Sequence, residues 1–137
     1  MSDIVRFGVS LPRELVETFD KHIDLKGYAS RSEAIRDIMR AYLVEQKWET
    51  GEGQVMGTVT IVYDHHTREL SRVLSDIQHH NHDAIVCTTH VHLDEHNCLE
   101  VIVIRGMAKQ VQHIANSLIS IRGVIHGKLV CTTGGTL

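Results

Sequence analysis

Residues 4–11 (IVRFGVSL) alternate between apolar and polar side chains. Because successive side chains of a β-strand point to opposite faces, this alternation predicts a strand with one apolar face. The apolar positions are Val5, Phe7, Val9 and Leu11, and the opposite face carries Arg6, Gly8 and Ser10. The segment that follows predicts helices, so this strand has no neighbouring strand with which to form hydrogen bonds. This part of the chain therefore needs a second copy to complete a sheet.

Two amphipathic helices are predicted after this strand. Pro12 suits the first turn of a helix, where a missing N–H costs nothing, and Gly27 is a typical left-handed stop after about Lys26. Residues 30–33 (SRSE) form a capping box, which predicts the start of a second helix that runs to about Gln46. A strand and two helices in about 45 residues enclose too small a core for a monomer. We therefore expect a two-fold dimer that pairs strand with strand and interlocks four helices.

The chain is predicted to divide into two domains. Residues 1–48 form the strand-and-helices domain, and residues 49–57 (ETGEGQVMG) are glycine-rich and polar, which predicts a linker. Residues 58–131 alternate between strand and helix periodicity, and residues 132–137 are expected to be a flexible tail. The expected elements are strands 58–63, 84–93, 98–105 and 124–130 and helices 68–78 and 108–121. This βαββαβ order predicts a ferredoxin-like fold, so the fold class is α+β.

Composition excludes several classes of protein. The longest apolar runs, such as VIVI at residues 101–104, are far shorter than the ~18 residues of a membrane-spanning helix. The first residues (MSD) do not resemble a secretory signal, and three cysteines without a CxxC pair favour a reducing cytosol. We therefore expect a cytoplasmic protein.

Eight of the 11 histidines lie between His65 and His96, and this cluster indicates a functional site because histidine is the commonest metal ligand.

The strongest feature within that cluster is His90-Val91-His92, followed five residues later by Cys98. Residues two apart on a strand share a face, so His90 and His92 point the same way. If residues 93–97 form a five-residue connection, Cys98 lies opposite His92 and joins that face, whereas a four-residue turn places it on the other side. The first register predicts three ligands of a four-ligand metal site. The alternative is a half-exposed strand with polar histidines and a small core cysteine.

A second group of histidines, in residues 78–83 (QHHNHD), can supply the fourth ligand. Each of them also has an ordinary explanation, because histidine in the last turn of a helix complements the helix dipole. Glu100 follows Cys98 by two residues on the same strand face, where it is either a carboxylate that accepts a hydrogen bond from a ligand histidine or a solvated charge. Square-planar sets of nitrogen and sulfur suit Ni(II) or Cu(II), and a tetrahedral set suits Zn(II). A reducing compartment favours nickel, because copper would be Cu(I) there.

The N-terminal strand predicts a second activity. Two such strands form an antiparallel ribbon, and the major groove of B-DNA accepts a ribbon of that width. Arg6, Gly8 and Ser10 would face the bases, and the start of the second helix would present free N–H groups to a phosphate. The alternative is a dimerisation ribbon whose outer face is only solvated.

The residue pattern resembles one known family over nearly the whole chain. RFGVSL with SRSEAIRDIMR (residues 30–40) is similar to a ribbon-helix-helix DNA-binding domain. Downstream, QHHNHD, HVHLDEHNCLEVIVIRG (residues 90–106) and RGVIHGKL (residues 122–129) resemble the nickel-responsive regulators of the NikR type. The resemblance implies a homotetramer, with ribbon-helix-helix dimers flanking a core of ACT-like regulatory domains. It also implies a repressor that binds a palindromic operator and lowers nickel uptake when nickel is plentiful.

The resemblance assigns roles to particular residues. It implies one square-planar Ni(II) per subunit, held by His90, His92 and Cys98 of one subunit and His79 of another. Gln78 and Glu100 would support those ligands. The base-reading residues would be Arg6, Gly8 and Ser10, although Gly8 stands where relatives carry a small hydroxyl residue and has no side chain with which to read a base. A weaker cation site would involve Glu33 and Asp37 with backbone carbonyls near Ile119, Ile121 and Val124.

Three other classes of function are weighed against this one. A metal enzyme needs an open coordination position, which four protein ligands do not leave. A ribbon-helix-helix regulator that senses a small organic molecule or another metal through its ACT-like domain is the main alternative. A nickel storage protein would have the metal site without sequence-specific DNA binding.

Overall fold

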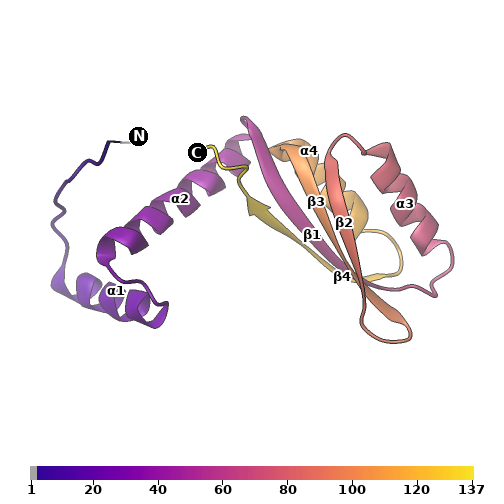
Figure 1. The fold of residues 1–137 in the computed structure, drawn as a ribbon, viewed down its shortest axis with the longest axis horizontal. Coiled ribbons are helices and arrows are strands. Elements are labelled where there is room, and N and C mark those ends of the chain that lie inside the picture. Colours follow the sequence, from indigo (N-terminus) through magenta and orange to yellow (C-terminus); the bar gives the residue numbers. More distant parts are fainter. Residues whose placement is uncertain (1–2) are drawn as a thin grey trace. The chain divides into compact units, whose positions relative to one another are not determined.

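The computed structural model describes residues 3–137, so the first two residues of the domain expected over 1–48 lie outside the described residues. The chain separates into two compact units, residues 1–40 and 41–137, and each is described by itself. Two helices, α1 (Arg13–Leu25) and α2 (Arg31–Thr50), supply the regular structure before the first strand (Figure 1).

Local chemistry fixes the ends of these helices. Pro12 immediately precedes α1, and after its last turn Gly27 adopts a positive φ of 83°, a conformation that suits glycine. Before α2, the Ser30 hydroxyl accepts a hydrogen bond from the Glu33 N–H at 3.2 Å, as the capping box predicts. The Glu33 carboxylate reaches back to the N–H of Ala29 at 3.3 Å, one residue earlier than in the standard motif.

The strand expected over residues 4–11 is not formed in the single chain, where residues 3–12 carry no regular secondary structure. The predicted strand requires a second copy: a strand is defined by hydrogen bonds to a neighbour, and residues 3–12 have no such neighbour within the described part of their own chain. Its apolar residues Val5, Phe7, Val9 and Leu11 are 80%, 70%, 63% and 54% exposed in the single chain.

The N-terminal unit has almost no core of its own. Among its described residues, Ala34 is the buried one. Large apolar side chains of the helices are exposed, and they include Leu15, Leu25, Ile35, Ile38 and Met39. Exposed apolar surface on this scale is typical of an interface, because a monomer would leave it in water.

The linker expected over residues 49–57 is shorter in the structure. Helix α2 continues to Thr50 and strand β1 (Gln54–Asp64) begins four residues later. Glycine content suggested flexibility, but Gly57 is a packing position: a Cβ there would lie 2.9 Å from a side-chain carbon of Val111. The side chain of Trp48 is buried and donates a hydrogen bond from its ring N–H to the carbonyl of Thr132 at 2.9 Å, which holds the end of α2 against the sheet unit.

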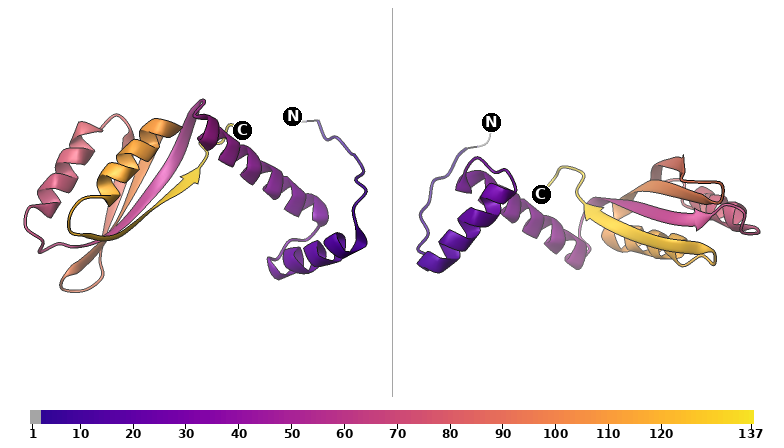
Figure 2. Two further views of the ribbon diagram at one scale, coloured as in Figure 1. Left: turned by 180° about the vertical axis from the view of Figure 1, so that it is seen from behind. Right: turned by 90° about the horizontal axis from the view of Figure 1, so that it is seen from below.

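The second unit has the predicted βαββαβ order. After β1 come α3 (Leu70–His80), β2 (Ile85–His92), β3 (Asn97–Met107), α4 (Ala108–Ile119) and β4 (Val124–Thr132). The four strands form one antiparallel sheet in the order β2-β3-β1-β4. Helices α3 and α4 lie over one face of this sheet (Figure 2). The ferredoxin-like arrangement is confirmed, with strand and helix ends shifted by a few residues from those expected.

The core of this unit lies between the sheet and the two helices. Alternate residues of β1 and β3 point inward, which gives both strands a regular alternation of buried and half-buried positions. The inward side chains include Val59, Ile61, Ile102 and Ile104, and α4 contributes Val111, Ile114 and Leu118. Among residues 3–137, no helix combines the length and the apolar character that a membrane crossing requires.

Candidate metal centre

The β2–β3 hairpin has the register on which the sequence argument depended. His92 pairs with Cys98 and His90 pairs with Glu100, so the connection between the strands spans residues 93–97. Residues directly opposite each other in an antiparallel pair share a face, which places all four side chains on one side of the sheet. This face of the sheet also carries the buried Ile102 and Ile104, and it is the face covered by α3 and α4.

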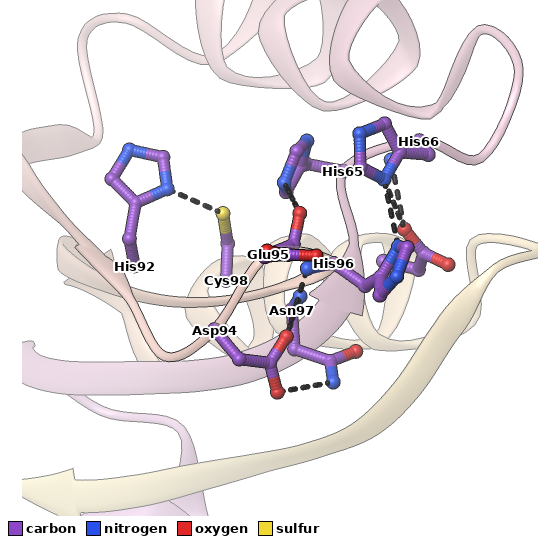
Figure 3. Close-up of polar contacts among 9 residues, drawn as sticks. His65, His66, His92, Asp94, Glu95, His96, Asn97 and Cys98 are labelled. Carbon is purple, nitrogen blue, oxygen red and sulfur yellow. Dashed lines mark hydrogen bonds and ion pairs between the residues drawn. The ribbon is translucent and has the colours of Figure 1, made fainter.

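Cys98 and His92 are in contact. The sulfur Sγ lies 3.4 Å from Nδ1 of the His92 ring. Figure 3 marks this contact with a dashed line. Cys98 is 3% exposed, whereas the His92 ring is at the surface. The other two cysteines, Cys87 and Cys131, are exposed. Cys87 belongs to the same hairpin but pairs with Val103, which places it on the opposite sheet face, and Cys131 lies in β4. The hairpin therefore places a sulfur and an imidazole nitrogen side by side, with the sulfur on the protected side.

Glu100 is a buried carboxylate, 1% exposed, whose hydrogen-bonding capacity is fully used. Oε1 accepts from the Gln78 side-chain amide and from the Thr88 hydroxyl, both at 2.8 Å. Oε2 accepts from the Tyr63 hydroxyl at 3.1 Å and lies 3.1 Å from Nε2 of His90. Burial, together with the nearby carboxylate, raises the pKa of Tyr63 well above its ordinary value. Of the two interpretations of Glu100, the solvated charge is excluded by this burial.

The contact with Glu100 also orients His90. Because Nε2 of the ring faces the carboxylate, Nδ1 is the nitrogen that remains for another partner. This is the arrangement that supports metal-ligating histidines in many proteins, where one ring nitrogen donates to a carboxylate and the other binds. In the single chain, however, His90 is not one of the donor groups gathered within 4.8 Å around Cys98 among the described residues.

His79 is likewise apart from that group. It lies in the last turn of α3 with its side chain exposed, and its ring centroid is 6.2 Å from that of His82. The neighbouring Gln78 points inward to Glu100, so the end of α3 is tied to the hairpin while His79 remains at the surface.

Sequence reasoning missed His65. One donor atom each of His65, His92 and Cys98 lie within 4.8 Å of one another. The ring of His65 follows the end of β1, and its Nε2 is 2.7 Å from the carbonyl oxygen of Glu95 in the hairpin loop. The register of β1 on β3, in which Tyr63 pairs with Cys98, carries the chain to this position. That pairing between distant segments is the signal that the sequence alone does not provide.

The donor set fits a transition metal with affinity for sulfur and nitrogen. A thiolate and imidazoles suit nickel, copper and zinc, and they do not suit magnesium or calcium, which prefer oxygen. Residues 56–132 match the family described as "NikR C terminal nickel binding domain", and residues 5–46 match "Ribbon-helix-helix protein, copG family". The chain belongs to the NikR family of nickel-responsive regulators.

Relatives in the NikR family match almost end to end. A protein of Geotalea uraniireducens is 58% identical over 135 residues, which cover 98% of this chain and 97% of the relative. Proteins of Geobacter sulfurreducens (57%, with the same coverage) and Pyrococcus furiosus (54% over 132 residues, 96% of each chain) are similar. All three are named "Putative nickel-responsive regulator". The NikR family is one of transcription regulators and not of enzymes.

A solved structure of an uncharacterized protein from Thermotoga maritima is similar in fold. Its TM-score is 0.52 with 18% identity, and the match covers 58% of this chain and 98% of that one. At that identity it shows the fold alone.

The N-terminal unit of this NikR-family chain is a ribbon-helix-helix DNA-binding domain. Arg6, Gly8 and Ser10 are exposed, and a Cβ added at Gly8 would meet nothing within 4 Å. The two acids of the expected weaker cation site are also exposed: the Asp37 carboxylate accepts from the Tyr28 hydroxyl at 2.8 Å, and Glu33 takes part in the helix cap.

Proposed function

We propose that this chain is a nickel-dependent repressor that binds a palindromic operator and lowers nickel uptake when Ni(II) is bound. One nickel per subunit would be held by His90, His92 and Cys98 of one subunit and His79 of another. The observation that carries the proposal is the 3.4 Å contact between Cys98 Sγ and His92 Nδ1 on a protected sheet face. Family membership supports nickel as the metal.

The surroundings of these side chains support their roles as ligands. Nickel would supply a cationic centre that stabilises the Cys98 thiolate, and binding would release the thiol proton. Glu100 holds His90 by its Nε2 and leaves Nδ1 available. Gln78 donates to the same carboxylate, so its neighbour His79 sits at a fixed helix end with an exposed ring. An exposed histidine in that position is suited to reach a site on another subunit.

Dimers and a tetramer follow from this assignment. The N-terminal unit leaves Val5, Phe7, Val9 and Leu11 in water, and pairing with a second copy would cover that face. A ligand shared between sheet units would join two such dimers into a homotetramer. We also propose that Arg6 and Ser10 read the operator from the opposite face of the ribbon, with Gly8 contributing no side chain. Because the operator is chromosomal, the protein would act in the cytoplasm.

Metal and DNA are coupled through the assembly in this proposal. Ligands drawn from two subunits favour one relative placement of the ribbons, and the operator favours the same placement. Such coupling is reciprocal, so DNA tightens metal binding as much as metal tightens DNA binding, typically by about 1–3 kcal/mol. Two ribbons held at a fixed spacing on one DNA face also gain avidity without new contacts.

Glu33 and Asp37 are proposed as part of a weaker cation site. The support is chemical: two exposed carboxylates lie one turn apart on α2. Glu33 accepts from the Ala29 N–H, and Asp37 accepts from the Tyr28 hydroxyl and forms an ion pair with Arg40 at 3.8 Å. If they bind a cation that assists the DNA-bound state, Asp37→Asn lowers operator affinity without changing nickel binding.

The experiment that tests the proposed function measures operator binding with and without nickel. DNA fragments that bind the nickel-loaded protein are first selected from a random-sequence library, and their affinity is then measured by electrophoretic mobility. We expect tight binding only with NiSO₄ present, and loss of that response in Cys98→Ala. Cys87→Ala is the matched control, because Cys87 is an exposed cysteine of the same hairpin on the opposite sheet face. Equal affinity in both metal states, or a response to an amino acid in place of nickel, would contradict the proposal.

A further inference from the structure

A second group of possible metal ligands lies beside the candidate centre and shares none of its residues. Asp64 ends β1, His66 follows it, and His96 lies in the loop between β2 and β3. One donor atom from each of the three lies within 4.8 Å of the other two. The two imidazoles face each other across the two segments, as Figure 3 shows. Both histidines belong to the group of eight between His65 and His96, and the proposed function does not use them.

The distances match those between neighbouring ligands of one ion. Nδ1 of His66 is 3.1 Å from Nδ1 of His96 and 3.5 Å from Oδ1 of Asp64. Two ligands bound to a transition metal at about 2.1 Å are roughly 3 Å apart at a right angle and about 3.4 Å apart at a tetrahedral angle. Two of the three distances between donors therefore already match those around one cation, and the third pair, His96 and Asp64, lies within 4.8 Å.

The backbone holds both histidine-bearing segments in place without a metal. The Asp64 carboxylate accepts from the His66 N–H at 2.8 Å, and the His65 N–H donates to the carbonyl of His96 at 2.9 Å. On the other side, the Asp94 carboxylate accepts from the His96 N–H at 2.8 Å. The ordering of these two segments is thus achieved before any ion arrives, which lowers the entropy cost of binding.

The protonation of the two rings is compatible with a shared cation. A hydrogen bond between the two Nδ1 atoms, which are 3.1 Å apart, requires one neutral ring to carry its proton on Nδ1 and the other on Nε2. For both Nδ1 atoms to bind a metal, the ring that carries its proton on Nδ1 must move that proton to Nε2. Both rings stay neutral, so no proton is released overall. Both rings are exposed, so each Nε2–H can donate to water.

We propose that Asp64, His66 and His96 form a second binding site for a divalent first-row transition metal, with water in the remaining coordination positions. Two imidazoles and a carboxylate without sulfur make a harder donor set than the Cys98 centre. An ion bound here links the end of β1 to the hairpin loop, two segments that are about thirty residues apart in the chain. The inference does not depend on repression or on DNA binding.

The test counts nickel ions bound to the full chain. Equilibrium dialysis of the metal-free protein against NiSO₄, followed by elemental analysis, gives ions per chain, and absorption of the dialysed sample reports nickel bound to thiolate. We expect His66→Ala and His96→Ala to bind one nickel fewer per chain than the unmodified protein, with the same thiolate absorption. His113→Ala is the matched control, because it removes an exposed histidine from α4.

The outcomes separate this inference from the proposed function. If both cluster variants bind as many nickel ions as the unmodified protein at saturation, the second site does not exist. If the count falls in His113→Ala as well, the loss is not specific to the cluster and the inference is overturned. If thiolate absorption is missing from the unmodified protein while the cluster variants still lose one ion, the proposed function fails and the second site remains. Asp64→Asn, which keeps the shape of the side chain, is expected to weaken this site at least tenfold.

Discussion

Truncation of Glu100 tests the buried network that supports the candidate centre. Glu100→Ala removes an acceptor that serves four donors, and of these Tyr63 is buried and cannot turn to water. An unsatisfied buried hydroxyl costs about 1–3 kcal/mol. The space left by the lost side chain costs about 1 kcal/mol more, partly offset because the buried charge is also removed. We expect the free energy of unfolding to fall by about 1–3 kcal/mol.

The assay is urea denaturation of the metal-free protein, followed by circular dichroism at one fixed chain concentration, since oligomers gain stability with concentration. Glu95→Ala is the control: the same residue type is exposed in the hairpin loop, and its loss should cost less than about 0.5 kcal/mol. Glu100→Gln keeps the volume but removes the charge, and it should weaken nickel binding by about 10–100-fold through His90. If Glu100→Ala is no less stable than Glu95→Ala, the carboxylate does not hold this network together and the reasoning is refuted.

Three further predictions concern other parts of the chain. Burial raises the pKa of Tyr63, so above pH 10 the folded protein keeps the phenol proton while the unfolded chain loses it, and the free energy of unfolding should fall by up to about 1.4 kcal/mol per pH unit. Denaturation curves measured at pH 9 and at pH 11 should show a smaller loss of stability in Tyr63→Phe than in the unmodified protein. The pKa of Asp94 is lowered to about 2 by hydrogen bonds from the side-chain amide and backbone N–H of Asn97 and from the N–H of His96. An NMR titration of the Asp94 carboxyl should have its midpoint at that pH, and Asn97→Ala should move the midpoint toward 3.8, whereas an unchanged midpoint would contradict the assignment. Ser30→Ala should cost about 1 kcal/mol by removing the hydrogen bond to the Glu33 N–H, measured by thermal unfolding, and a cost near zero would mean that the cap is not formed.

Periodicity accounts for much of what the sequence predicted. Alternating side chains in β3, from Cys98 to Ile104, match the alternation of buried positions, and the apolar spacing of α4 matches its buried face. The five-residue connection was decisive for the centre, because a shift of one residue would have placed Cys98 on the other face. In each case the signal is local, within a segment or a single hairpin.

What the sequence missed depends on contacts between distant segments. The environment of Glu100 requires Tyr63, Gln78 and Thr88 to meet from three elements, which no local pattern reveals. His65 reaches Cys98 only through the pairing of β1 with β3. The N-terminal strand is absent from the single chain for a different reason, since its pattern describes a pairing of two copies.

The central claim is that nickel binds the Cys98 thiolate together with histidines from two subunits. An anaerobic Ni(II) titration followed by absorption spectroscopy tests it most directly. We predict a thiolate-to-nickel absorption band that saturates at one equivalent per chain, persists in Cys87→Ala and is lost in both Cys98→Ala and His79→Ala. An unmodified protein that shows no such band at saturating nickel, or a band that survives Cys98→Ala, would contradict the account.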